Sequence, residues 1–122
     1  MSFASKKFGN EGEDIAARLL ISKGYEILER NYRFSKGEID IVALDPSTNY
    51  LVFVEVKSRT NLEYGEPEYA VTKNKIRQVK RIAEAYLYEK EMNNVDCRFD
   101  VVTVLFRSKI KPIINHYENA FM

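Results

Sequence analysis

The chain has 122 residues, of which 45% are hydrophobic and 12% aromatic, and its formal net charge is +1. This size allows one hydrophobic core and excludes a second ordinary domain, so we expect a single domain over residues 1–122. The absence of any apolar run of about 20 residues excludes a membrane-spanning helix and predicts a cytoplasmic protein without a membrane partner. One cysteine and one histidine exclude an internal disulfide and the usual structural zinc site, so any metal would need oxygen ligands.

The sequence pattern predicts seven elements in the order α-β-β-β-α-β-β. Asn10 and Glu13 fit a capping box that starts a first helix, and Gly24 ends this helix. Thr72 caps a second helix, and residues 60–71, which contain glycine and proline, form a loop before it. Stretches rich in β-branched and aromatic residues are expected to form strands at 25–33, 39–44, 50–57, 99–106 and 113–117.

The second and third predicted strands carry two acids and a lysine within apolar runs. If these strands form a symmetric hairpin, Asp40 lies opposite Glu55, and both share one face with Lys57 while Ile39 and Ile41 line the other. Opposed carboxylates about 5 Å apart repel each other unless a cation joins them or they share a proton. Mg²⁺ or Mn²⁺ suits such an all-oxygen site. The alternative is a solvated rim with an ordinary ion pair, worth about 0–1 kcal/mol.

A lysine beside two metal-binding acids is typical of phosphodiester hydrolysis. The ion can supply a water as the nucleophile, and the lysine can orient that water or offset charge that grows on the phosphate. Asp40 followed by Glu55-Val56-Lys57 resembles the PD-(D/E)XK nuclease signature, with Ile39 in place of its proline. That superfamily includes restriction endonucleases and archaeal Holliday-junction resolvases.

The whole chain resembles a narrower group, the bacterial YraN family of uncharacterised endonuclease-like proteins. The resemblance is carried by the ordered segments GNEGEDIAARLLISKGYEIL, RNYR, GEIDIVA, FVEVKSR, YGEP and RFDVV. It implies an α/β fold of the α+β mixed-sheet type, with a restriction-endonuclease-like αβββαβ core and an extra C-terminal strand. It therefore implies a PD-(D/E)XK nuclease-like domain.

The resemblance also implies roles for individual residues. Asp40, Glu55 and the backbone carbonyl of Val56 would hold Mg²⁺ or Mn²⁺, and Asp40, Glu55 and Lys57 would form the catalytic set. The similarity to resolvases makes Glu13 a further candidate metal or water ligand. Its alternative role is structural, because a capping-box acid is favourable in a first helical turn.

The second helix begins with a basic segment that contains no acid. Its five cations are Lys73, Lys75, Arg77, Lys80 and Arg81. Cations are unfavourable at the positive end of a helix dipole, and a phosphate would reverse that penalty. The helix could follow a DNA backbone without reading bases, and Arg59 could add a phosphate contact. The alternative is a solubilising face. Asp100 and His116 are interpreted as structural.

Three functions remain open at this stage. The first is a Mg²⁺- or Mn²⁺-dependent endodeoxyribonuclease, for which the resolvase resemblance suggests branched or structured DNA. The second is a non-catalytic nucleic-acid-binding module that keeps the fold, and the third is an interaction domain whose acids serve only folding. The intact set of Asp40, Glu55 and Lys57 favours the first. A homodimer would suit a two-strand cut, because one copy covers only a short length of duplex.

Overall fold

The computed structural model describes residues 3–60 and 72–120, with side chains in the first range from residue 10 onward. The elements are α1 (Phe3–Ser22), β1 (Glu26–Phe34), β2 (Gly37–Asp45), β3 (Tyr50–Arg59), α2 (Lys73–Glu89), β4 (Cys97–Arg107) and β5 (Ile110–Tyr117). The predicted element order and the mixed α/β class are confirmed. Most of the predicted loop at 60–71 lies outside the described residues. No helix in the described ranges is both long enough and apolar enough to cross a membrane.

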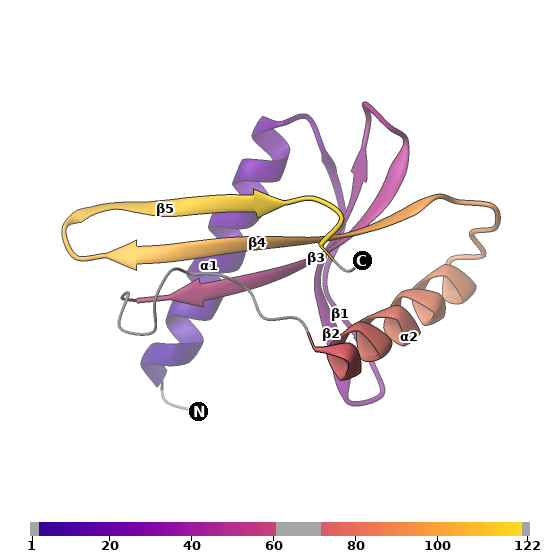
Figure 1. The fold of residues 1–122 in the computed structure, drawn as a ribbon, viewed down its shortest axis with the longest axis horizontal. Coiled ribbons are helices and arrows are strands. Elements are labelled where there is room, and N and C mark those ends of the chain that lie inside the picture. The colour runs from indigo at the N-terminus through magenta and orange to yellow at the C-terminus, as the bar shows by residue number, and fades with distance from the viewer. Residues whose placement is uncertain (1–2, 61–71, 121–122) are drawn as a thin grey trace.

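The strands form one mixed sheet in the order β1-β2-β3-β4-β5 (Figure 1). The first three strands are antiparallel neighbours, β3 and β4 run parallel, and β5 returns antiparallel beside β4. A parallel pair needs a crossover connection, and α2 lies in the one between β3 and β4. The predicted extra C-terminal strand is β5, at one edge of the sheet.

The two helices cover opposite faces of the sheet. On one face, α1 packs against side chains that include Ile41, Val52 and Val54. On the other, α2 packs against a set that includes Ile39 and Phe53. Successive side chains of a strand point to opposite faces, which explains why Phe53 and Val54 belong to different clusters.

The side-chain alternation of β2 breaks at Asp40. Ile39 and Ile41 were expected on one face, and this prediction is wrong, because Ile39 packs on the α2 side and Ile41 on the α1 side. On the N-terminal side of Ile41, β2 is no longer paired with β3, but it stays paired with β1 as far back as Gly37. At Asp40, β2 therefore remains paired with β1 and is separate from β3.

The first helix begins earlier than predicted. Asn10 was expected to cap it, but α1 already starts at Phe3, so Glu13 lies inside the helix and not in its first turn. The capping-box role of Glu13 is therefore wrong. Asn10 is a weak helix former and a favoured cap residue, and this made it resemble a start. The cap of α2 is as predicted, because the Thr72 side chain accepts a hydrogen bond from the Lys75 N–H at 3.1 Å.

Candidate active site at the strand fork

The site is built around a fork between β2 and β3. Their pairing runs from Asp45↔Tyr50 to Ile41↔Val54, in the register that a symmetric hairpin predicts. It stops one pair before Asp40 and Glu55, so these two residues do not face each other in the ladder as expected. The carboxylate of Asp40 instead accepts a hydrogen bond from the Val56 N–H at 2.7 Å. A side chain thus spans the fork where a ladder hydrogen bond would otherwise lie.

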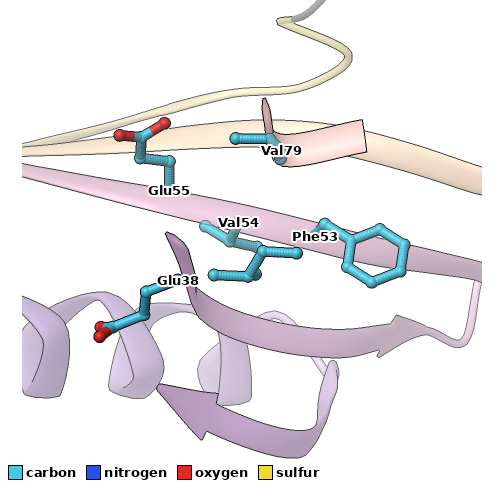
Figure 2. Close-up of a pocket in the computed structure, with 6 residues that line it drawn as sticks. Glu38, Phe53, Val54, Glu55 and Val79 are labelled. Carbon is cyan, nitrogen blue, oxygen red and sulfur yellow. The ribbon is translucent and has the colours of Figure 1, made fainter. Parts of the chain in front are cut away.

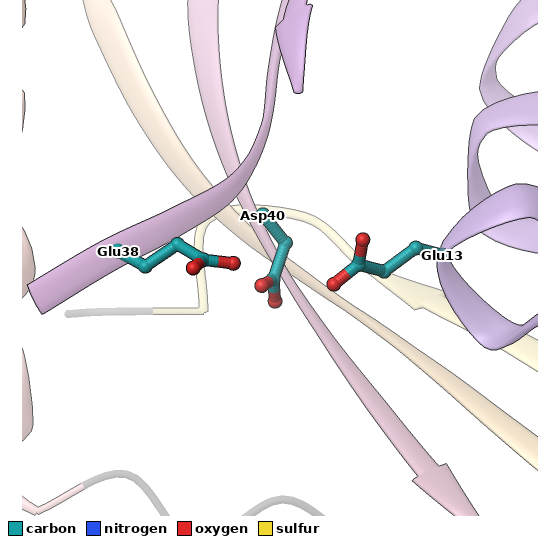
Figure 3. Close-up of side chains that lie close together, drawn as sticks. All are labelled: Glu13, Glu38 and Asp40. Atoms are coloured by element: carbon teal, nitrogen blue, oxygen red, sulfur yellow. The ribbon is translucent and has the colours of Figure 1, made fainter. Parts of the chain in front are cut away.

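Three carboxylates converge beside this fork. Glu13 of α1 points toward Glu38 and Asp40 of β2 (Figure 3). Carboxylate oxygens of the three residues, which we call the acidic trio, all lie within 4.8 Å of one another. Gly12 makes the approach of α1 possible, because a Cβ at this position would overlap the Ser58 hydroxyl of β3. The close contact between helix and strand brings Glu13 to the fork.

Residues of β1 also contact the acidic trio, whose members come from α1 and β2. Asn31 has a left-handed backbone (φ 56°), which asparagine tolerates better than most residues. With its amide nitrogen turned toward the acids, Asn31 donates to Glu13 at 3.0 Å and to Glu38 at 2.9 Å. The Arg30 guanidinium lies 3.7 Å from the Glu13 carboxylate and 2.8 Å from that of Asp14. A neutral donor and a cation therefore partly offset the repulsion among the acids.

Burial and repulsion change the acidity of the trio. Burial is the largest cause that raises the pKa of Asp40, to about 7; the Val56 N–H opposes it, and the carboxylates of Glu13, Glu55 and Glu38 add to it. Burial, followed by the charge of Glu38, also raises the pKa of Glu13, whereas Arg30 lowers it. Near neutral pH Asp40 is therefore protonated in part, and a bound cation would displace that proton.

Glu55 lies on the α2 side of β3, whereas the acidic trio includes Glu13 of α1. A small hollow is lined by both Glu38 and Glu55, but their carboxylates point away from each other (Figure 2). One oxygen of Glu55 lies 3.2 Å from the Lys75 ammonium of α2. The other oxygen is buried and has no hydrogen-bond partner among the described residues. The structure thus brings Asp40 together with Glu13 and Glu38, and it holds Glu55 against Lys75.

Lys57 and Val56 occupy the same part of β3. Lys57 follows Glu55 by two residues, so both point to the α2 side of the sheet. The N–H and C=O groups of one residue in an extended strand point the same way, so the Val56 carbonyl faces the fork beside Asp40. The predicted backbone ligand therefore has the required direction.

Sequence reasoning missed Thr103, which is paired with Lys57 across the parallel ladder. Its side chain is buried, and its hydroxyl has no hydrogen-bond partner within the described part of the chain. An unpaired buried hydroxyl costs about 1–3 kcal/mol, which a valine at the same place would avoid. In the sequence, the position of Thr103 within a run of valines and leucines was the feature that could have identified it. Asn31 and Glu38 were also not assigned to the site, although both lie in the segments that carry the family resemblance.

The predicted basic residues lie largely at the surface. Four of them are exposed along α2: Lys73, Arg77, Lys80 and Arg81. Lys75 is half-buried and paired with Glu55, and Arg59 is exposed at the end of β3. The exposed cations offer a surface for a phosphate backbone, and Lys75 connects this surface to the candidate site.

Asp100 and His116 belong to a separate buried network, in keeping with their structural interpretation. Asp100 accepts hydrogen bonds from Arg98 at 2.9 and 3.0 Å and from the Asn119 N–H at 3.0 Å. Its carboxylate also lies 2.8 Å from His116 Nε2. Arg98 reaches further to Asp45 at 3.0 Å. These contacts hold β4 to the end of β2 and to β5.

Comparison with known proteins shows that the fork and α2 lie within a segment that matches a protein family. The model of the uncharacterised protein family UPF0102 matches residues 12–104. A UPF0102 protein of Geobacter sulfurreducens is 47% identical over 120 residues, which cover 98% of this chain and 92% of the relative. A UPF0102 protein of Natranaerobius thermophilus is 45% identical over 119 residues, which cover 96% of this chain and 98% of the relative.

Proposed function

The chain belongs to the uncharacterised protein family UPF0102, the YraN family that its motifs resemble, and from its site we propose that it is a metal-dependent nuclease that hydrolyses DNA phosphodiester bonds. The acidic trio at the strand fork is the observation that carries this proposal. Three half-buried carboxylates that meet from α1 and β2 repel one another, and the repulsion contributes to the raised pKa of Asp40. A divalent cation would convert this unfavourable arrangement into a favourable one.

The residues at the fork fit Mg²⁺ or Mn²⁺. Both ions prefer oxygen ligands, and the trio supplies carboxylate oxygens from Glu13, Glu38 and Asp40. The Val56 carbonyl faces the same fork. Glu55 would join these ligands by leaving Lys75, and its buried oxygen, for which residues 3–60 and 72–120 offer no hydrogen-bond partner, supports this exchange. When bound, the ion would act as a Lewis acid on a phosphoryl oxygen.

The cations of the chain would serve the phosphates of the substrate. Lys57 lies on the same face as Glu55, where its ammonium can stabilise negative charge that grows on the scissile phosphate. The exposed cations of α2 can bind the backbone on either side of this phosphate, because such contacts position a duplex without reading its sequence. Lys75 would move from Glu55 to a phosphate when Glu55 takes up the ion. Branched or structured DNA is the proposed substrate form.

A second candidate function is a nucleic-acid-binding module that does not cleave. The ion pair between Lys75 and Glu55 favours it, because there the acid fixes the basic helix and does not contribute to the trio. This function needs the cations of α2 but not the carboxylates at the fork.

A cleavage assay with matched variants separates the two functions. Labelled linear and four-way-junction DNA is incubated with Mg²⁺ or Mn²⁺ and with wild-type, Asp40→Asn, Lys57→Met or Glu84→Gln protein. Glu84 is an exposed acid of α2 and serves as the control. The nuclease proposal predicts cleavage that Asp40→Asn and Lys57→Met abolish, while DNA binding and the activity of Glu84→Gln persist.

Binding without cleavage under all of these conditions would instead support the module. Titration of the wild-type protein with Mn²⁺ gives a second measurement that does not depend on activity. The nuclease proposal requires that Asp40→Asn weakens Mn²⁺ binding. A protein that neither binds Mn²⁺ nor cleaves DNA would exclude it.

A further inference from the structure

A second hollow lies between the β1–β2 turn and α2. Its volume is about 220 Å³, and Gly37, which lines it, directly precedes Glu38 of the trio. Gly37 allows the turn to approach the helix, because a Cβ there would lie only 2.5 Å from the Ile82 side chain. We call this space the hairpin hollow.

The walls of the hairpin hollow combine an aromatic ring with cations. Phe34, the last residue of β1, is 43% exposed, whereas Tyr32 of the same strand is buried in the core. Lys36 and Arg81 provide two exposed cations, and Gln78 provides an exposed amide. None of the described residues that line the hollow is acidic. A flat apolar group that carries a negative charge would match these walls.

We propose that the hairpin hollow takes one unpaired nucleobase of the DNA substrate, stacked on Phe34, while Arg81 and Lys36 bind its phosphate. The proposal rests on the proposed nuclease function and deepens it, because it makes DNA with unpaired nucleotides the preferred substrate. Gln78 lies where its amide can hydrogen-bond the edge of the base. Glu38 directly follows Gly37 in β2, so the hollow and the acidic trio belong to the same end of this strand but face opposite sides of it.

The size and chemistry of the hollow support a single base. Pockets for drug-sized ligands have volumes of about 300–1,000 Å³, so the hairpin hollow suits one flat ring system and not a larger ligand. Bases stack on aromatic side chains with little sequence preference, because every base has a π-face. A base within an intact duplex is stacked on both sides and would first have to leave its neighbours. The hollow therefore discriminates by pairing state and not by sequence.

The test measures binding in the absence of metal, so that cleavage does not contribute. Fluorescence anisotropy compares one labelled duplex with the same duplex carrying a single-stranded tail. The wild-type protein should bind the tailed DNA on the order of tenfold more tightly, the size expected for one base–aromatic stack. Phe34→Ala should remove this preference without changing affinity for the duplex, and Phe34→Tyr should retain it.

Two further variants complete the design. Tyr88→Ala removes an aromatic side chain that is 88% exposed near the C-terminal end of α2, away from the hollow, and should keep the preference. Arg81→Gln should weaken binding to the tailed DNA and reduce the slope of log affinity against log salt by about one. Circular dichroism of each variant establishes that it is folded.

The outcomes separate this inference from the proposed function. If the wild-type protein binds both DNAs equally, or if Phe34→Ala keeps the preference, the inference is overturned while a nuclease that acts on duplex DNA remains. If no DNA of either kind is bound, both proposals fail. Loss of the preference in Phe34→Ala together with its retention in Tyr88→Ala would support the inference.

Discussion

Replacing Asp40 by asparagine should stabilise the metal-free protein at alkaline pH. The pKa of Asp40 is raised from 3.8 to about 7. At about 1.4 kcal/mol per tenfold change, the charged form costs the folded state roughly 4 kcal/mol at about pH 8, and partial exposure reduces this to roughly 2–4 kcal/mol. The folded protein binds the proton more tightly than the unfolded chain, so this cost is absent below about pH 4 and grows until the pH passes about 7.

Denaturant unfolding in a metal chelator, at about pH 4 and about pH 8, measures this effect. Asparagine keeps an oxygen that can accept the Val56 N–H, so Asp40→Asn should unfold with wild-type stability at the lower pH. At the higher pH it should be more stable than wild type by roughly 2–4 kcal/mol, or on the order of 10 °C in Tm. Added Mn²⁺ should stabilise the wild-type protein much more than the variant.

The control for this measurement is Asp14→Asn, one residue from Glu13 on α1. Asp14 is exposed and paired with Arg30, so its replacement should change stability by less than about 1 kcal/mol at either pH. An Asp40→Asn protein that is less stable than wild type at the higher pH would refute the reasoning. It would mean that the Asp40 charge is favourable in the fold without a cation.

Three other variants test single contacts of the site. Lys75→Met should tighten Mn²⁺ binding severalfold in a calorimetric titration, because Glu55 loses the partner that competes with the ion; an unchanged affinity would exclude Glu55 as a ligand. Gly12→Ala should lower the free energy of unfolding by about 1–3 kcal/mol through overlap with Ser58, and Ser58→Ala should restore part of it; a neutral Gly12→Ala would show that the close approach is not required. Thr103→Val should raise the free energy of unfolding by about 1–3 kcal/mol in chemical denaturation, whereas a marked loss would reveal a partner for the hydroxyl within the fold.

The fold could be predicted because its elements are determined by residues that are close together in the sequence. Apolar alternation and the turn residues near Ser47 fix the hairpin, and the pairs from Ile41↔Val54 to Asp45↔Tyr50 follow the predicted register. The Thr72 cap was readable because its side chain satisfies a nearby backbone N–H. The start of α1 was not, because Asn10 has the residue type of a cap while the helix continues through it.

The candidate site could be predicted only in part, because its geometry depends on contacts between distant segments. The sequence identified Asp40, and the family resemblance identified Glu13 as a possible ligand. The separation of β2 from β3 before Ile41, over residues 37–40, is not encoded in the alternation of either strand, so Asp40 was expected opposite Glu55. The role of Asn31 depends on a left-handed backbone in β1 and on the approach of α1, and neither follows from its neighbours in sequence.

The hydrogen bond from Val56 to Asp40 makes one backbone amide a reporter of the fork. The amide proton donates directly to the carboxylate, so its NMR chemical shift senses whether that group is charged, protonated or coordinated. Val56 is also paired with Val102, so the same resonance is anchored in the rigid centre of the sheet. A nitrogen-labelled sample could therefore follow the occupancy of the fork by spectroscopy, without any substrate being added.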